Sequence, residues 1–286
     1  MSATPSPLPP FLFSVDLEDI RQLVPEGDQL RDRVEATTEQ ILAFLERHDA
    51  RCTFFTTGDV ARRYPGLVKR IAAAGHEIGC HSSEHIPLDR QDGASFRADL
   101  EACLDAYARA GVERVQGYRA PIASLTARTR WAYGVLRELG FRYSASVLAA
   151  RNPLYGWPDF GPDRPTRMDG LWELPVSLVA LPGAKVPFAG GVYFRILPYP
   201  LIRHCFRRRL SAGSPVLGYL HPYDVDREQE RFMYPEIGGS RLYNRLMHHG
   251  REKVIPRLEK LMTLGARIRT YGEYVRDHLE QAPGRA

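Results

Sequence analysis

The segment Gly75-His76-Glu77-Ile78-Gly79-Cys80-His81-Ser82-Ser83-Glu84-His85 decides how the rest of the chain is interpreted. A helical pattern ends at Gly75, residues 76–80 indicate a short buried strand, and two histidines follow where that strand ends. In α/β folds, functional groups gather at the carboxyl ends of parallel strands. Two imidazoles four residues apart can bind one zinc or similar ion if a third protein ligand is present. Taken alone, such a pair is also typical of a solvated helix face.

A second predicted strand, residues 11–15, ends in a cluster of three acids, Asp16, Glu18 and Asp19. Burying like charges together is costly unless a cation or a shared proton compensates. One carboxylate could complete a metal site with the two histidines, and a second could act as a general base toward an attacking water. The alternative is a helix N-terminus, because acids that follow a strand often cap the next helix.

Short apolar runs alternate with helical patterns along almost the whole chain, which indicates βαβ units and a parallel sheet. Residues 150–170 are rich in proline, glycine and aromatic residues, and we expect a loop over the mouth of a barrel there. We predict one α/β domain over residues 11–279, with short disordered tails at residues 1–10 and 280–286. Strands are expected at residues 11–15, 52–55, 76–80, 115–119, 143–147, 171–176, 216–220 and 267–270.

Composition narrows the class of protein further. A chain of 286 residues with 44% hydrophobic content can bury one large core. The net charge of +5 is mildly basic, and basic residues concentrate in Arg203–Arg209. This stretch is either a solvated helix face or a surface that attracts anionic membrane head groups or a pyrophosphate-linked glycan. We do not expect nucleic-acid binding, because neither stacking aromatics nor a helix-turn-helix pattern accompanies the charge.

The four cysteines show no C-x-x-C spacing, and those in strand or helix patterns are expected to be small buried hydrophobes without disulfides. The first ten residues are rich in serine and proline. No signal peptide or membrane span is visible, so we expect a cytoplasmic protein.

Five segments in order along the chain resemble the motifs of the polysaccharide deacetylases of carbohydrate esterase family 4, whose members carry a NodB-homology domain. The resemblance runs over most of the chain. The spacing of the acids in the first segment is similar to that of the branch that acts on exported and surface polysaccharides. The five segments are Ser14–Asp19, His81–His85, Gly117–Pro121, Asp169–Pro175 and Tyr219–Asp224.

The resemblance implies a distorted (β/α)7-8 barrel and a metal-dependent N-deacetylase. It implies that His81, His85 and a carboxylate hold a divalent metal, expected to be Zn²⁺, with Co²⁺, Mn²⁺ or Ni²⁺ as alternatives. The commonest first motif of the family has adjacent aspartates, whereas this chain has the spacing D-x-E-D. By resemblance to relatives with D-x-D, Glu18 is the expected metal ligand, and Asp19 is the alternative.

The remaining motif residues receive roles from the same resemblance. Asp16 is expected to be the catalytic base, held bidentately and oriented by Arg119. His221 is expected to donate a proton to the leaving amine. The spacing of the fourth motif departs from the family pattern, so either Asp169 or Glu173 could support His221.

The resemblance also places substrate contacts at Tyr118, whose segment would supply a backbone N–H to the oxyanion, and at Trp172 and Leu220, which would wall the pocket. Tyr193, beside a glycine pair, offers a face for stacking on a sugar. The expected substrate is an N-acetylated sugar in a polysaccharide or lipid-linked precursor. A deformylase, a cyclic-amide hydrolase and a non-catalytic glycan-binding relative are the alternatives.

Overall fold

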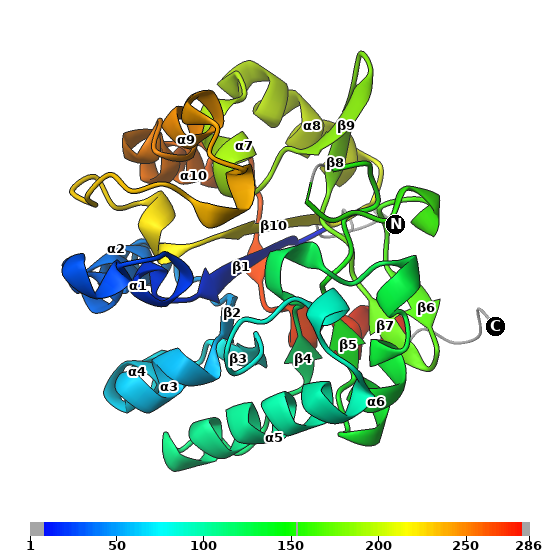
Figure 1. Ribbon diagram of the computed structural model, residues 1–286. Helices are drawn as coiled ribbons and strands as arrows, with labels where there is room; N and C mark the ends of the chain where they lie inside the picture. Colours follow the sequence, from blue (N-terminus) through cyan, green and yellow to red (C-terminus); the bar gives the residue numbers. More distant parts are fainter. Residues whose placement is uncertain (1–8, 153, 282–286) are drawn as a thin grey trace.

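A computed structural model describes residues 9–152 and 154–281, and its central feature is a curled, mostly parallel sheet with helices around the outside (Figure 1). The strands follow the order β10-β1-β2-β3-β4-β5-β7-β6, and β11 also pairs with the beginning of β1. Among the described strands of this sheet, β6 alone runs antiparallel to its neighbour. The sheet strands are β1 (Phe11–Leu17), β2 (Thr53–Thr56), β3 (Glu77–Cys80), β4 (Gly117–Tyr118), β5 (Tyr143–Ser144), β6 (Thr166–Met168), β7 (Leu171–Glu173), β10 (Val216–Leu220) and β11 (Ile268–Arg269).

The expected distorted α/β barrel is confirmed in this curled form. The end strands of the sheet, β10 and β6, are not paired with each other among the described residues. The segment after β7 instead contacts β10, where Ser177 N donates to Leu217 O at 3.0 Å. A separate hairpin pairs β8 (Leu178–Leu181) with β9 (Ala184–Pro187).

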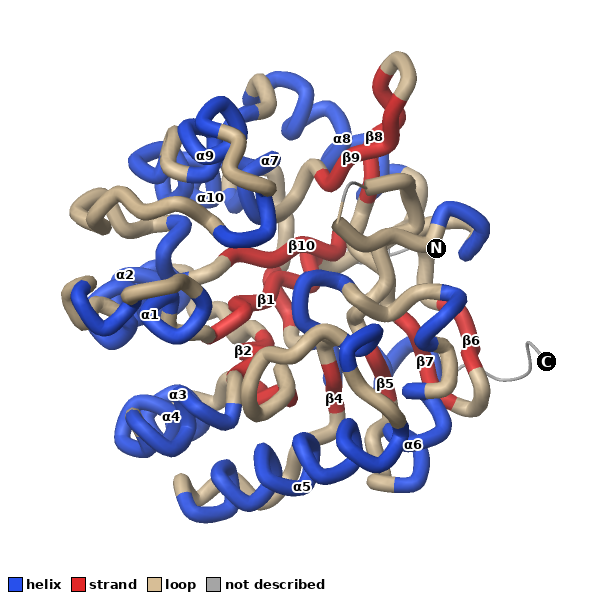
Figure 2. The backbone as a smooth tube through the Cα atoms, viewed as in Figure 1, coloured by secondary structure: helices blue, strands red, loops and turns tan. Residues whose placement is uncertain are grey.

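Helices follow most strands, as the alternating sequence pattern predicts (Figure 2). Among the described residues, no helix combines the length and the apolar content needed to cross a membrane. The α-helices are α1 (Ile20–Leu23), α2 (Val34–Arg47), α3 (Gly58–Arg63), α4 (Pro65–Ala73), α5 (Gly93–Arg109), α6 (Ala132–Glu138), α7 (Gly191–Ile196), α8 (Tyr199–Ser211), α9 (Arg241–Met247), α10 (Val254–Met262) and α11 (Tyr271–Tyr274), followed by a π-helical turn, Val275–Glu280.

Alternation along β1 separates the core from the chemistry. Every residue of β1 is buried, and in a parallel strand that is covered on both faces this requires a nearly continuous apolar run. Ser14 and Asp16 interrupt the run at alternate positions and therefore face the same side, the barrel interior. Phe13 and Val15 face the opposite side and pack in the main core.

Several strands are shorter than the sequence predicts because the chain leaves the sheet early near the carboxyl ends. The strand expected at residues 143–147 ends at Ser144. The N–H groups of Ser146 and Val147 instead donate to the Glu173 carboxylate, at 2.8 and 3.0 Å. A side chain thus replaces the neighbouring strand as hydrogen-bond partner.

The four cysteines are free and buried, as expected. Most of the two tails predicted at residues 1–10 and 280–286 lies outside the described residues. Glu280 itself ends the terminal π-helical turn.

Candidate metal centre and active site

Three potential ligands converge just beyond the ends of β1 and β3. Glu18 Oε2 lies 2.9 Å from His85 Nε2 and 3.6 Å from His81 Nε2. The three ligand atoms lie within 4.8 Å of one another, and all three side chains are largely buried. The histidines lie in an irregular loop, in which Ser82 and His85 have positive φ angles, and not on the solvated helix face considered above.

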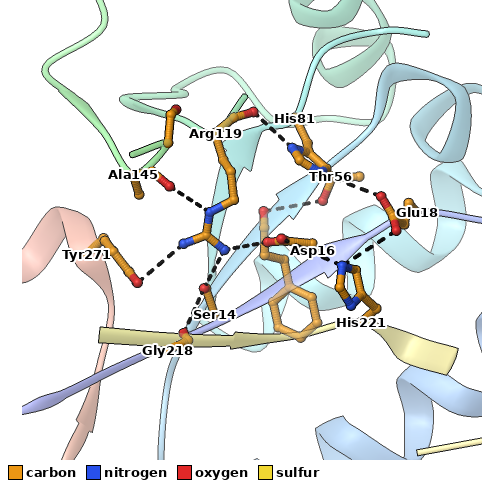
Figure 3. A network of polar contacts seen from close by, with 12 residues as sticks. Ser14, Asp16, Glu18, Thr56, His81, Arg119, Ala145, Gly218, His221 and Tyr271 are labelled. Carbon is orange, nitrogen blue, oxygen red and sulfur yellow. Dashed lines mark hydrogen bonds and ion pairs between the residues drawn. The ribbon is translucent and has the colours of Figure 1, made fainter. Parts of the chain in front are cut away.

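The residues fit a divalent cation. Glu18 is 4% exposed, and its Oε2 is buried without a hydrogen-bond partner among the described residues. An unpaired buried carboxylate oxygen is costly, whereas two imidazoles and one carboxylate form a common zinc-binding set. His81 Nδ1 lies 2.9 Å from the carbonyl oxygen of Arg119, which leaves its Nε2 directed toward Glu18 (Figure 3).

Electrostatics distinguish Glu18 from an ordinary buried acid. Burial alone would raise the pKa of Glu18, but the charges that His85 and His221 can carry hold this pKa well below its usual value. The Glu18 side chain is therefore kept ionised despite its burial.

Asp19 lies on the opposite side of the chain from this cluster. Its carboxylate accepts from Arg21 N at 3.0 Å, which caps α1, and pairs with Arg21 Nη2 at 2.9 Å and Arg63 Nη1 at 3.0 Å. The helix-capping interpretation of the acid cluster therefore applies to Asp19, while Glu18 is the carboxylate beside the histidines.

Asp16 lies beside this cluster and contacts Arg119 directly (Figure 3). The contact is made by one nitrogen, Nη1, so the bidentate pair expected from the sequence is not formed. Arg119 Nε donates to Ala145 O at 2.9 Å, and Nη2 donates to Tyr271 Oη at 3.3 Å. Nη1 also donates to Ser14 Oγ at 2.8 Å. These bonds fix the guanidinium, which in turn positions Asp16.

His221 follows β10 and completes the cluster. Its Nε2 lies 3.6 Å from Glu18 Oε1 and 4.0 Å from Asp16 Oδ2. Its Nδ1 lies 3.0 Å from Asp224 Oδ2, which also accepts from the His221 backbone N–H at 2.9 Å. Burial would lower the pKa of His221, but the carboxylates of Glu18 and Asp224 outweigh burial and raise the pKa to about 9.

Asp224 is itself held by a fully buried arginine. Arg195 Nε lies 2.9 Å from Asp224 Oδ1, and both side chains are 0% exposed. Burial would raise the pKa of Asp224, but Arg195 and His221 lower it to about 2. Asp224 thus remains ionised beside His221.

The expectation that Asp169 or Glu173 supports His221 is not met. Asp169 is exposed and pairs with Arg130 at 2.8 Å. Glu173 is buried but accepts from the backbone of the 146–147 turn and from Tyr133 Oη at 2.9 Å. The acid that contacts His221 is three residues downstream in the same motif, a spacing at which a carboxylate can also cap the following turn.

Of the four predicted substrate contacts, only Tyr193 lines the cavity beside the cluster. Leu220 and Tyr118 precede His221 and Arg119 by one residue, so their side chains face the core outside the barrel. Trp172 packs against the interior cluster that contains Phe55 and Tyr143.

The site opens into one large cavity of about 660 Å³. Its floor carries the cluster of Asp16, Glu18, His81, His85 and His221, which we call the catalytic cluster after its proposed role. Its walls come from α1, the turns near residues 122 and 147, α7 and α9. Sequence reasoning missed Asp224, Arg195 and also Tyr223, whose hydroxyl donates to Glu18 Oε1 at 3.2 Å and whose ring stacks on His221 at 4.5 Å. The spacing H-x-x-D could have indicated Asp224, whereas nothing local to Arg195 indicates its partner.

Two family models together match most of the chain. Residues 27–144 match "Polysaccharide deacetylase", and residues 145–271 match "Domain of unknown function (DUF3473)". A peptidoglycan-N-acetylglucosamine deacetylase of Bacillus cereus is 40% identical over 63 residues, which are 22% of this chain and 23% of that protein. A chitooligosaccharide deacetylase of Rhizobium leguminosarum bv. trifolii is 31% identical over 96 residues, which are 32% of this chain and 45% of that protein.

These alignments span less than half of the length of either relative. The fold match is longer. The structure of a candidate polysaccharide deacetylase from Mycobacterium smegmatis superposes with a TM-score of 0.55 at 21% identity, covering 94% of this chain and 96% of that chain. The family model includes His81, His85 and Arg119, and the common fold extends over both halves. Residues 27–144 therefore match the polysaccharide deacetylase family, and the chain as a whole shares the fold of the Mycobacterium smegmatis protein.

Proposed function

We propose that this protein is a metal-dependent N-deacetylase that hydrolyses the acetamido group of an N-acetylated sugar in a polysaccharide or glycolipid precursor. The observation that carries the proposal is the convergence of Asp16, Glu18, His81, His85 and His221 at the floor of one cavity. The names of the two bacterial relatives, which refer to peptidoglycan and chitooligosaccharide deacetylation, agree with this class of substrate.

Glu18, His81 and His85 would hold the divalent metal, with Zn²⁺ as the first choice for this donor set and Co²⁺, Mn²⁺ or Ni²⁺ as alternatives. When bound, such a cation supplies Lewis acidity, which polarises an amide carbonyl and favours deprotonation of water. The unpaired Oε2 of Glu18 is the atom that most requires such a partner.

Asp16 is the proposed general base. Its carboxylate lies between Arg119 and His221, and Arg119 is fixed by three further hydrogen-bond partners. A carboxylate held in this way can accept the proton of a water that attacks the acetamido carbon. Arg119 acts as a positioning residue for Asp16.

His221 is the proposed general acid. Its raised pKa, about 9, keeps the imidazole protonated near neutral pH, and Asp224 fixes the orientation of the ring. When the C–N bond of the amide breaks, Nε2 gives its proton to the departing nitrogen. The hydroxyl of the water remains on the acyl carbon, so the products are acetate and a free amino sugar.

The test is acetate release from N-acetylhexosamine oligomers and lipid-linked precursors by protein stripped of metal and then reconstituted. We expect activity that depends on the metal. Asp16→Asn and His221→Gln should lower turnover by about 100-fold or more while metal content stays close to wild type. His81→Ala should lose both metal and turnover, and an active His81→Ala variant would refute the metal assignment.

The same assay separates other chemistries on this fold. Formate release or opening of a cyclic amide, without acetate release, would indicate the deformylase or cyclic-amide hydrolase alternative. Stoichiometric metal without any turnover would favour a glycan-binding protein.

A cytoplasmic location and contact with an anionic membrane surface stay predictions. The support for membrane contact is the Arg203–Arg209 stretch, in which Arg203, Arg207 and Arg208 are exposed on α8. Cell fractionation at low and high salt would test them, because contact with anionic lipid should weaken as ionic strength rises.

A further inference from the structure

The walls of the cavity are much less polar than its floor, where the catalytic cluster lies. Beyond the catalytic cluster and its Arg195–Asp224 support, its polar lining is limited to Ser146, Asn152 and tyrosine hydroxyls. A sugar chain presents many hydroxyl groups, and each one that is buried requires a hydrogen-bond partner. The wall instead contains aliphatic side chains from several separate elements, among them Ile20, Val24, Ile122, Ile237, Leu246 and Met247.

The apolar surface continues from the cavity to the outside of the molecule. Five large hydrophobic side chains are exposed among the described residues, and all five lie at the cavity or next to it in sequence. Leu154 and Tyr243 line the cavity themselves. Each of the other three, Ile86, Met233 and Leu242, is adjacent in sequence to a lining residue. Because Leu242 also lies one helical turn from the lining residue Leu246 on α9, we call Leu154, Leu242 and Tyr243 the apolar rim.

The side chains of the apolar rim are more exposed to solvent than is usual for large hydrophobic residues. Leu242 is 69% exposed and Tyr243 is 59% exposed, next to each other on α9. Scattered exposed hydrophobic residues need no explanation, but a concentration at the mouth of one cavity marks a binding surface. Because the same wall runs from the catalytic floor to the rim, a ligand that uses the rim can also reach the catalytic groups.

Charge next to the rim is positive. Arg227, Arg231, Arg241 and Arg245 are exposed, and none of them forms an ion pair with another described residue. Two acids of the same segment, Glu228 and Glu230, are paired with Arg33 and Arg31. Among the described side chains, these four guanidinium groups therefore have no ion-pair partner, and such groups favour an anionic phosphate or an anionic membrane surface.

We propose that the substrate is an amino sugar linked through phosphate to a long apolar chain, and that the apolar wall and the apolar rim bind this chain. This inference rests on the proposed deacetylase function and specifies its substrate class. The acetamido group would lie at the catalytic floor, with the phosphate beside the sugar inside the cavity. The chain would run along Ile237 and Leu246 toward Leu242 and Tyr243, and the arginines beside the rim would face the anionic surface of the membrane that holds the chain. A long N-acyl group in place of the acetyl group would explain an apolar cavity, but it would explain neither an exposed rim nor the charges beside it.

The first experiment compares three synthetic substrates. One is an N-acetylglucosamine oligomer without a chain, the second is N-acetylglucosamine 1-phosphate esterified with prenyl chains of increasing length, and the third is methyl glucosaminide with an N-octanoyl group. For the second series, KM should fall by up to about fourfold for each methylene that enters the cavity, while kcat changes little.

Each outcome has a separate meaning. Equal kcat/KM for the chain-free and prenylated substrates would overturn this inference and leave the deacetylase function intact. Faster cleavage of the N-octanoyl substrate would also overturn it, because the chain would then belong to the acyl group. Absence of turnover on all three would instead contradict the proposed function itself.

The second experiment uses variants of exposed residues, which do not disturb the core. Leu242→Ser should raise KM for the prenylated substrate by at least about fivefold, more than KM for the chain-free oligomer. The double variant Arg241→Gln/Arg245→Gln should do the same when the prenylated substrate is embedded in vesicles that contain anionic lipid. The matched control is Lys69→Gln/Arg109→Gln, which removes two exposed charges from α4 and α5, helices that contribute no residue to the cavity. Equal effects of the α9 variants and the control would overturn the proposal.

Discussion

Two carboxylates inside the barrel, Glu18 and Glu77, show how differently one fold can use the same group. Glu77 lies at the start of β3, near the amino ends of the strands. It accepts from Thr53 Oγ1 at 2.6 Å, Gly272 N at 2.9 Å and Tyr143 Oη at 2.9 Å. Glu18 lies at the opposite ends of the strands, with one oxygen unpaired and three histidines around it.

The electrostatic consequences are opposite. Burial raises the pKa of Glu77 and its hydrogen bonds do not fully compensate, whereas the histidines hold the pKa of Glu18 well below its usual value. Burial of an acid is therefore no sign of function by itself. An unpaired oxygen that faces other potential ligands and an open cavity is the feature that distinguishes Glu18, the candidate metal ligand, from Glu77.

The largest expected effect tests this distinction directly. Glu18→Gln should lose bound metal and should lower deacetylation by more than the roughly 100-fold that loss of an outer-shell partner causes. Glu77→Ala should keep the metal but lower the free energy of unfolding by about 1–3 kcal/mol, because Thr53 and Gly272 lose their acceptor. Metal analysis, acetate release and urea unfolding of both variants decide the matter, and loss of metal in Glu77→Ala alone would reverse the assignment.

A smaller effect is expected from the acid that supports His221. Asp224→Asn should lower kcat by about 100-fold at neutral pH, since the imidazole loses the carboxylate that orients it and stabilises its protonated form. Metal content should stay unchanged. Asp169→Asn, which alters only an exposed pair with Arg130, is the matched control and should behave as wild type. A larger loss in the control than in Asp224→Asn would restore the assignment made from sequence.

The smallest effect concerns His76, just before Glu77 at the structural end of the barrel. Burial and the nearby charge of Arg51 lower the pKa of His76 to about 4. Between this value and the ordinary value near 6.5, the unfolded chain binds more protons than the folded protein, so stability falls as pH drops through this window. Urea unfolding at pH 7.5 and 5.0 should therefore show a smaller decrease for His76→Asn than for wild type. Equal decreases would show that His76 does not contribute.

Much of the fold followed from local pattern. Alternating apolar runs and helical stripes predicted the parallel sheet, because a strand covered on both faces must be apolar along nearly its whole length. Ser14 and Asp16 could be recognised as exceptions within β1 for the same reason. The strand ends were less predictable, because at residues 146 and 147 a distant carboxylate, Glu173, takes the hydrogen bonds that a neighbouring strand would otherwise provide.

The residues of the candidate site also fall into those that could be predicted from the sequence and those that could not. Residues directly beyond strand ends, such as Glu18, His81 and His221, could be proposed from sequence because parallel strands bring their carboxyl ends to one edge. Trp172, Leu220 and Tyr118 could not be placed correctly from motif proximity alone. For Leu220 and Tyr118 the reason is strand alternation, since a shift of one residue turns a side chain from the cavity to the core.

The sequence by itself determined the α/β class, the histidine pair and the acids that accompany it, because each depends on residue type and on short-range spacing. Only the tertiary structure decided which acid faces which partner. Glu18 rather than Asp19 meets the histidines, Asp224 rather than Asp169 or Glu173 meets His221, and Arg195 reaches Asp224 from 29 positions earlier in the chain. Such pairings depend on the direction of each side chain after the chain has closed into a barrel, and no local pattern contains that direction.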